Sequence, residues 1–297
     1  MKKLLFTGCG TALITPFNEN GINFEEFEKM IEFQIKEEAD AIIVCGSTGE
    51  YSTMTDEEQK ATIKFAIDTA RKRIPVIAGT GSNNTAHAVQ TSKYAESVGA
   101  DGLLIVTPYY NKTTQEGLIK HYEAIANEVS LPIIIYNVPV RTGLNVLPDT
   151  FLKLSKIENI AAVKEASGNI SQIVEISNLC RENLAIYSGN DDQILPVLSV
   201  GGVGVISTIS NIIPKDVHNM VDYFMNGKIK ESMLLQLNTL NLTSALFSEV
   251  NPIPVKEAMN MIGFNAGVPR LPLVPLSPTG KEKVRKALLE YGIKIVE

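Results

Sequence analysis

The chain has 297 residues, of which 44% are hydrophobic and 20% are charged, and its formal net charge is −6. This length exceeds that of a usual single domain but fits an α/β barrel with additions. A chain without a basic excess is poorly suited to neutralise a phosphate backbone or an anionic membrane surface. We therefore expect neither nucleic acid nor a membrane among its partners.

The cysteines and the N-terminal residues indicate a cellular compartment. The 3 cysteines cannot all pair with one another, and they follow no C-x-x-C or metal-ligand spacing. The apolar stretch after Lys2 and Lys3 covers residues 4–6 only, whereas a secretory signal needs roughly 7 to 15 apolar residues. No segment approaches the ~20 apolar residues of a transmembrane helix. We predict a cytoplasmic protein.

Short apolar runs alternate with helical patterns along the chain, as repeated βα units require. Several runs are nearly continuous in Val, Ile, Leu and Ala, which is typical of parallel strands covered on both faces. We predict strands near residues 10–14, 41–45, 75–78, 102–106, 132–136, 160–164, 185–188 and 203–207. The helices predicted between them cover residues 24–38, 55–72, 85–98, 114–128, 148–156 and 170–181.

The position of the polar residues decides between a closed barrel and an open sheet. Several polar side chains lie at the carboxyl ends of different predicted strands, where barrel enzymes build their sites. They are Ser47, Thr48, Thr107, Tyr136, Lys164 and either Ser188 or Asn190. An open sheet usually binds its ligand beside a glycine-rich phosphate loop, and the sequence has no G-x-G-x-x-G motif. We predict a (β/α)8 TIM barrel over residues 1–213.

Residues 214–297 follow the eighth predicted strand and contain no further strand pattern. Prolines at positions 269, 272, 275 and 278 prevent this tail from being helical throughout. We predict a C-terminal helical extension packed on the barrel, with helices near residues 214–226, 229–247, 254–261 and 278–291.

Lys164 ends an otherwise apolar strand and shares a strand face with Ala162. Burial disfavours the ammonium form, so the pKa of a lysine inside a barrel falls and the amine becomes a usable nucleophile. Such an amine forms Schiff bases with carbonyl substrates. The alternative is that Lys164 extends to solvent or pairs with Glu165.

Tyr136 ends the preceding strand, and Arg141 follows it. A phenol beside an amine can move protons on and off oxygen while a carbinolamine forms and breaks. A guanidinium suits a carboxylate. Taken separately, Tyr136 could equally be core filler and Arg141 a surface charge.

The turn at residues 46–50 reads G-S-T-G-E, and its backbone N–H groups and hydroxyls could hold an anion. Turns of this composition are common, so the motif alone is weak. Tyr109 and Tyr110 follow the fourth strand, where they could also serve packing or an interface. The histidines are scattered within helical patterns and no H-E-x-x-H motif occurs, so we predict no metal.

Together these motifs resemble the dihydrodipicolinate synthase and N-acetylneuraminate lyase family, from about residue 8 to the end of the chain. The resemblance rests on four motifs in the order and spacing of that family. They are G-S-T-G-E at 46–50, V-T-P-Y-Y-N at 106–111, Y-N-V-P with R-T-G within 136–143, and V-K-E-A-S-G at 163–168.

The resemblance implies a covalent pyruvate Schiff base on Lys164 and no separate cofactor. Tyr136 is then the central proton-transferring phenol, and Ser47 and Tyr110 are its relay partners. The family places the pyruvate carboxylate at Ser47 and Thr48. The position of Tyr110 reaches into a neighbouring subunit, which implies a homo-oligomer, either a dimer or a tetramer. The implied substrate-binding residues are Thr48, Arg141, Gly189 and Ile206.

Arg141 favours, within this family, the condensation of pyruvate with L-aspartate-4-semialdehyde. The product is 4-hydroxy-tetrahydrodipicolinate, a precursor of diaminopimelate and lysine. One alternative is another pyruvate-dependent aldolase, such as a sialic acid or keto-deoxy-sugar lyase. The other is a non-catalytic barrel that binds a 2-keto acid.

Feedback inhibition by lysine is a further property of some family members. The possible allosteric positions in this chain are Asn83, Tyr109 and His87. Asn83 and Tyr109 match the lysine-sensitive pattern. The positions that depart from it are Tyr51, Asp56, Gln59 and His87. We therefore expect lysine to inhibit weakly or not at all.

Overall fold

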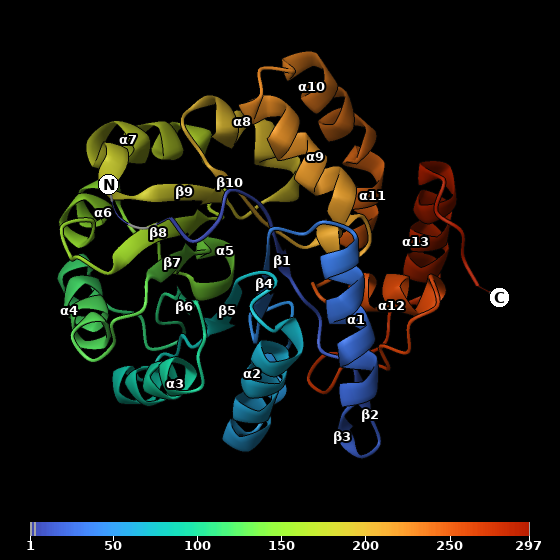
Figure 1. The fold of residues 1–297 in the computed structure, drawn as a ribbon, viewed down its shortest axis with the longest axis horizontal. Coiled ribbons are helices and arrows are strands. Elements are labelled where there is room, and N and C mark those ends of the chain that lie inside the picture. The colour runs from blue at the N-terminus through green and yellow to red at the C-terminus, as the bar shows by residue number, and fades with distance from the viewer. Residues whose placement is uncertain (1, 3, 297) are drawn as a thin grey trace.

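Eight parallel strands close into a barrel, in the order β1-β10-β9-β8-β7-β6-β5-β4, and helices surround them (Figure 1). The computed structural model of the chain describes residues 2 and 4–296. The barrel strands are β1 (Gly8–Ala12), β4 (Ala41–Val44), β5 (Val76–Gly79), β6 (Gly102–Val106), β7 (Ile133–Asn137), β8 (Ile160–Glu165), β9 (Ala185–Ser188) and β10 (Gly204–Ser207). The predicted TIM barrel is confirmed.

Six helices lie where the sequence predicts them between the strands. They are α1 (Phe24–Lys36), α2 (Asp56–Ala70), α3 (Thr85–Ser97), α4 (Gln115–Ala126), α6 (Pro148–Leu154) and α7 (Ile170–Cys180). A capping box starts α2, with Thr55 and Glu58 each accepting a hydrogen bond from the backbone of the other. Side chains of Asn or Thr likewise cap α1, α3, α4 and α7.

Several short elements are absent from the sequence prediction because they span too few residues to show a period. A hairpin of β2 (Phe17–Asn18) and β3 (Gly21–Ile22) follows β1, and α5 (Pro139–Thr142) follows β7. Helix α8 (Ile194–Ser199) lies between β9 and β10. The 3-10 turns are η1 (Tyr51–Thr53), η2 (Arg181–Asn183), η3 (Asp191–Gln193) and η4 (Ile209–Asn211). The first strand also begins at Gly8, two residues before its predicted start.

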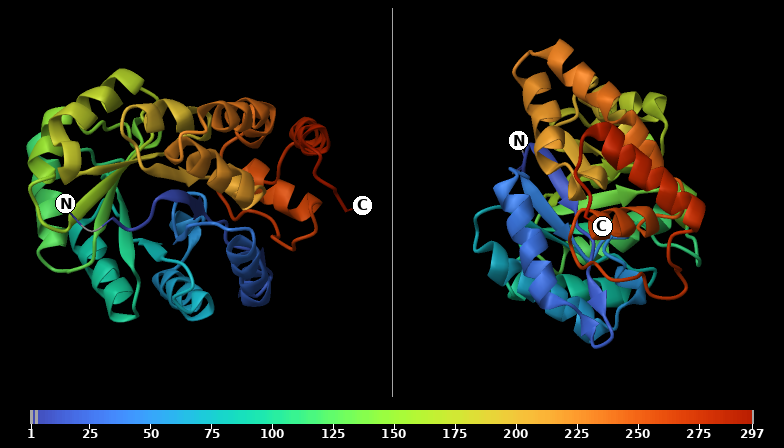
Figure 2. Two further views of the ribbon diagram at one scale, coloured as in Figure 1. Left: turned by 45° about the horizontal axis from the view of Figure 1, so that its top comes forward. Right: turned by 90° about the vertical axis from the view of Figure 1, so that its right-hand side faces the viewer.

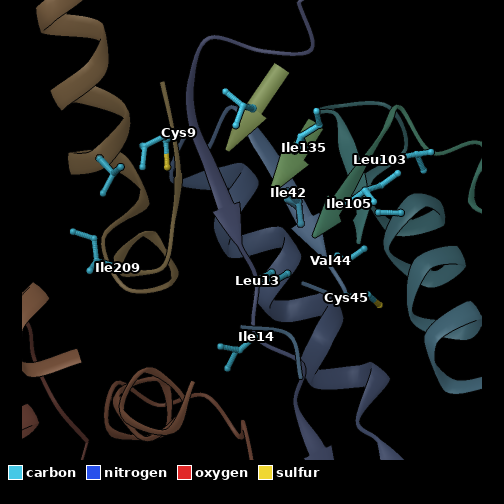
Figure 3. Close-up of a cluster of buried hydrophobic side chains, with 14 of the residues drawn as sticks. Cys9, Leu13, Ile14, Ile42, Val44, Cys45, Leu103, Ile105, Ile135 and Ile209 are labelled. Carbon is cyan, nitrogen blue, oxygen red and sulfur yellow. The ribbon is translucent and has the colours of Figure 1, made fainter. Parts of the chain in front are cut away.

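Alternate residues of each strand belong to two separate apolar cores. Side chains such as Ile42, Val44 and Ile135 point outward and pack under the helices, as Figure 3 shows. Their sequence neighbours, among them Ile43 and Ile134, fill the barrel interior. This alternation explains why the strands read as continuous apolar runs. It also means that any polar side chain on the inner face lies among apolar side chains.

The C-terminal extension is helical and lies along one side of the barrel (Figure 2). Its helices are α9 (Pro214–Met225), α10 (Ile229–Asn238), α11 (Leu240–Leu246), α12 (Ile253–Met261) and α13 (Pro278–Tyr291). Helix α9 packs directly on β1, and α13 lies outermost. The boundary at residue 213 stays a prediction.

The single helix predicted over residues 229–247 is wrong, because α10 ends at Asn238 and α11 begins at Leu240, with Thr239 between them. Thr239 is fully buried, and its hydroxyl donates to the carbonyl oxygen of Gln236 at 3.0 Å. None of the helices described between residues 4 and 296 combines the length and apolar character needed to cross a membrane.

An ion pair joins α9 to Asp40, the residue before β4, and makes stability depend on pH. His218 Nδ1 lies 2.8 Å from Asp40 Oδ2, and this contact raises the pKa of His218. A raised folded-state pKa stabilises the fold fully below the unfolded value of about 6.5, and the stabilisation is lost as pH rises through the folded value. We expect His218→Gln to lower the melting temperature more at pH 5.5 than at pH 8.5. A pH-independent difference would contradict this assignment.

Candidate active site

Lys164 lies on the inner face of β8, inside the barrel. Its side chain belongs with Ala162 to the interior, and it is 5% exposed. Its Nζ lies 4.4 Å from the centre of the Tyr136 ring. The pKa of Lys164 is lowered to about 8, chiefly by burial, against which Asp191 acts to raise it and with which Arg141 acts to lower it. The amine therefore exists in part as the neutral nucleophile near neutral pH.

Glu165 does not pair with Lys164, so the alternative of a simple ion pair between neighbours is wrong. Glu165 lies on the opposite face of β8 and is 1% exposed. Its Oε2 accepts a hydrogen bond from Asn137 Nδ2 at 2.9 Å, and its Oε1 accepts one from the Ser167 backbone at 2.8 Å. Strand alternation thus separates the two charges.

Tyr136 stands beside Lys164 because β7 and β8 pair in register, with Tyr136 opposite Lys164 and Asn137 opposite Glu165. The phenol is 7% exposed. Burial raises the pKa of Tyr136, while Arg141 and the Ser47 hydroxyl lower it. A phenol that stays protonated against an amine can both donate and accept a proton.

A hydrogen-bonded network behind the two strand ends fixes this register, and sequence analysis did not find it. Asn137 Nδ2 donates to Asn145 Oδ1 at 2.9 Å as well as to Glu165. Asn145 Nδ2 donates in turn to Gln172 Oε1 at 2.7 Å. The sequence did hold one indication of this network. Asn137 and Glu165 are polar residues that directly follow Tyr136 and Lys164, so they point to the outer face of their strands. Satisfied buried networks of this kind hold neighbouring side chains in one arrangement.

The turn at residues 46–50 lies at the carboxyl end of β4 and faces the barrel mouth. Thr48 is 4% exposed, and its hydroxyl lies 3.5 Å from that of Thr208. Among the residues that the structure describes, the backbone N–H groups of Ser47 and Thr48 donate to no protein acceptor. Paired N–H groups and hydroxyls at one turn can hold a carboxylate.

A cavity of about 230 Å³ opens above this turn. Ser47, Tyr109, Arg141 and Asn251 are among its lining residues. Arg141 is exposed and donates from Nη2 to the carbonyl oxygen of Asn251 at 3.2 Å. A smaller void beneath shares Ser47 with the cavity and reaches Tyr136. Lys164 is in neither lining, and it contacts the Tyr136 ring that the smaller void reaches.

Gly189 and Ile206 also lie at this end of the barrel, Gly189 directly after β9 and Ile206 on β10. The Gly189 N–H donates to the carbonyl oxygen of Glu165 at 2.8 Å, and an added Cβ would lie 2.6 Å from the Ala166 Cβ. Ile206 is buried in the barrel interior. Asp191, which sequence analysis missed, is 3% exposed and accepts backbone hydrogen bonds from Thr208 at 3.0 Å and Ile209 at 3.2 Å.

Comparison with known proteins identifies the family. The sequence model of the dihydrodipicolinate synthetase family matches residues 5–291. The chain belongs to this family. It is 58% identical over 294 residues to the 4-hydroxy-tetrahydrodipicolinate synthase of Caldicellulosiruptor bescii, covering 99% of each chain.

Solved structures of the dihydrodipicolinate synthetase family superpose closely on this chain. The enzyme from Aquifex aeolicus is 43% identical, with a TM-score of 0.96 over 98% of this chain and 100% of that one. The enzyme from Acinetobacter baumannii, described as chloride inhibited and complexed with pyruvate, is 40% identical. Its TM-score is 0.95 over 97% of this chain and 99% of that one.

Tyr110 stands apart from the other predicted site residues. It is 92% exposed and has a left-handed backbone, with φ of 66°. Within one chain it does not line the cavity that Ser47 lines. A bulky residue in this conformation is uncommon and marks a local constraint. Its relay role from a neighbouring subunit stays a prediction for this family member.

The three possible allosteric residues lie near the start of α3 and the end of β6. His87 Nε2 lies 3.0 Å from Asp56 Oδ1, and the Asn83 carbonyl accepts a hydrogen bond from Asn111 at 3.0 Å. Tyr109 lines the cavity. His87 is thus engaged by Asp56, which is itself a departure from the lysine-sensitive pattern. Their allosteric role stays a prediction.

Proposed function

We propose that this chain is a 4-hydroxy-tetrahydrodipicolinate synthase, a class I aldolase that condenses pyruvate with L-aspartate-4-semialdehyde. One observation carries the proposal: a buried lysine amine with a lowered pKa lies against a buried phenol at the carboxyl ends of paired strands. Family membership and the name of the 58% identical relative support it. The same activity implies a role in lysine and diaminopimelate biosynthesis.

The first step is attack of neutral Lys164 Nζ on the pyruvate carbonyl carbon. The turn at Ser47 and Thr48 holds the pyruvate carboxylate through its N–H groups and hydroxyls. Tyr136 gives a proton to the carbinolamine oxygen, which leaves as water when the imine forms. The low exposure of Lys164 and Tyr136 keeps competing bulk water away from the imine.

The second step forms the new carbon–carbon bond. Tyr136, which gave up its proton in the first step, takes a proton from the pyruvate methyl group, and the imine becomes an enamine. The enamine attacks the aldehyde carbon of L-aspartate-4-semialdehyde, and Tyr136 returns the proton to the aldehyde oxygen, which becomes the hydroxyl group. The amino group of the adduct then attacks the imine carbon, so the ring closes and the Lys164 amine is released. Arg141 lies at the cavity, where its guanidinium suits the carboxylate of the second substrate.

Substrate tests separate this function from its alternatives. Steady-state product formation from pyruvate and L-aspartate-4-semialdehyde is the expected activity. Cleavage of sialic acid or a keto-deoxy sugar at a higher kcat/KM would instead assign a lyase. No turnover of any of them, with pyruvate still bound, would favour the non-catalytic 2-keto-acid-binding barrel.

The pKa of Lys164 predicts how imine formation depends on pH. The neutral fraction of an amine with a pKa of about 8 rises ~10-fold per pH unit below that value and levels off above it. We therefore expect the initial rate of pyruvate trapping by cyanoborohydride to rise from pH 6 to pH 8 and then flatten. A rate that kept rising to pH 10 would show an ordinary, undepressed lysine.

Lysine is expected to be a weak inhibitor or none, since the departures at Tyr51, Asp56, Gln59 and His87 change most of the polar groups that would bind it. Initial rates measured against added lysine test this expectation. Half-inhibition at submillimolar lysine would contradict it.

A further inference from the structure

The pair of Lys256 and Glu50 differs from the other ion pairs of the described residues by its burial. Lys256 Nζ lies 2.7 Å from Glu50 Oε1, with side-chain exposures of 1% and 0%. Lys256 lies on α12 of the C-terminal extension, whereas Glu50 is the last residue of the 46–50 turn. A buried ion pair adds little net stability compared with apolar packing, so its use here calls for a positional explanation.

Glu50 fixes the end of the turn in an unusual backbone conformation. Its φ is 57°, in the left-handed region that side chains other than glycine disfavour. Its second carboxylate oxygen, Oε2, accepts the Arg270 backbone N–H at 3.0 Å. Both oxygens are therefore bound by the extension, from two separate segments of it.

The groups that hold Glu50 are themselves fixed. Lys256 Nζ and Arg270 Cζ each lie 4.1 Å from the centre of the Phe17 ring. The Arg270 guanidinium also binds both carboxylate oxygens of Glu58 at 2.7 Å, and Glu58 belongs to the capping box of α2. The extension, the β2–β3 hairpin and α2 thus meet behind the turn.

A second contact from the extension holds the middle of the turn. Asn251 Nδ2 donates to Thr48 Oγ1 at 2.9 Å, and the Asn251 carbonyl accepts the hydrogen bond from Arg141. Asn251 is 8% exposed. Thr48 and Glu50, on either side of Gly49, are therefore both bound by residues of the extension.

We propose that Lys256 is a positioning residue, which acts through Glu50 to aim the N–H groups and hydroxyls of Ser47 and Thr48 at the pyruvate carboxylate. The inference rests on the proposed function, since it assigns the turn to pyruvate. Lys256 touches no reacting atom. Through Glu50 it holds the turn in the conformation that binds pyruvate before pyruvate arrives, so less free energy is spent on ordering the turn when pyruvate binds.

The test compares Lys256→Met with the matched control Lys281→Met. Lys281 lies on α13 and pairs with Glu257 of α12 at 2.8 Å, so the control removes an ion pair of the same extension that does not touch the turn. We expect Lys256→Met to raise KM for pyruvate about tenfold or more, with KM for the aldehyde changed less than threefold. The control should leave both KM values within twofold of the wild type.

Hydrogen exchange of the peptide that covers residues 46–50 gives a readout without turnover. It should quicken in Lys256→Met and stay unchanged in Lys281→Met. An unchanged KM for pyruvate, or an equal rise in both KM values, would overturn the positioning role. If the wild type does not convert pyruvate and the aldehyde, the proposed function is refuted instead. The hydrogen-exchange comparison would then still show whether the contact between Lys256 and Glu50 orders the turn.

Glu50→Gln provides a second route if Lys256→Met does not fold. The amide keeps the volume and one acceptor oxygen for Arg270, but its NH2 group cannot accept a hydrogen bond from the Lys256 ammonium, so the contact between Lys256 and the turn is lost. The pKa of Lys256 is lowered to about 8, chiefly by burial, so the unpaired amine can lose its proton and the variant can fold. The same selective rise in KM for pyruvate is expected. An unchanged KM in a folded Glu50→Gln enzyme would also overturn the proposal.

Discussion

Lys164→Met is expected to abolish condensation, with a loss in kcat on the order of 10⁴-fold or more, because the variant has no amine to form the imine. Methionine is unbranched and fills the space of the lysine stem without a charge. Steady-state rates with pyruvate and L-aspartate-4-semialdehyde measure the loss. Activity within tenfold of the wild type would contradict the role of Lys164.

The same variant should be at least as stable as the wild type, which separates a catalytic lysine from a structural one. Burial lowers the folded-state pKa of Lys164 to about 8. This depression costs on the order of 3 kcal/mol below pH 8, and the cost disappears as pH rises toward the unfolded value. We expect Lys164→Met to raise the melting temperature at pH 7. A lowered melting temperature would mean that the ammonium supports the fold.

Tyr136→Phe is expected to lower kcat by ~10²- to 10⁴-fold, because the ring stays in place and only the proton-transferring hydroxyl is lost. Pyruvate trapping at Lys164 should become slower but still occur, since the amine remains. Comparison of kcat and of the trapping rate measures both effects. A kcat unchanged within threefold would remove Tyr136 from the proton transfers.

Tyr122→Phe is the matched control for this change. The Tyr122 hydroxyl is also buried, and it donates to the carbonyl oxygen of Ile105 at 3.0 Å, outside the barrel interior. Its loss should cost about 1 kcal/mol of stability and leave kcat unchanged. A similar fall in kcat in both variants would point to a general loss of structure.

Much of the fold could be predicted because each barrel strand is covered on both faces. That burial produces the continuous apolar runs, and it also makes Lys164 conspicuous as the one cation at the end of such a run. The position of Tyr136 beside Lys164 could be predicted as well, since neighbouring parallel strands end at the same rim of the barrel. The helix break at Thr239 could not be predicted, because the sequence pattern does not change at this residue.

The contacts that hold the site residues in place were much harder to predict. Asn251, Lys256 and Arg270 lie in a helical tail, and nothing in its pattern places these side chains against a turn some 200 residues earlier. The partners of Asn137 and Glu165 depend on how α6 and α7 pack outside the barrel. Such contacts between distant segments follow only from the closed fold.

The most direct test of the central claim is incubation with pyruvate and sodium borohydride, followed by intact and peptide mass analysis. We predict one reduced pyruvate adduct per chain, on the peptide that holds Lys164, and none in Lys164→Met. Absence of an adduct in the wild type, or an adduct on another lysine, would contradict the Schiff-base mechanism.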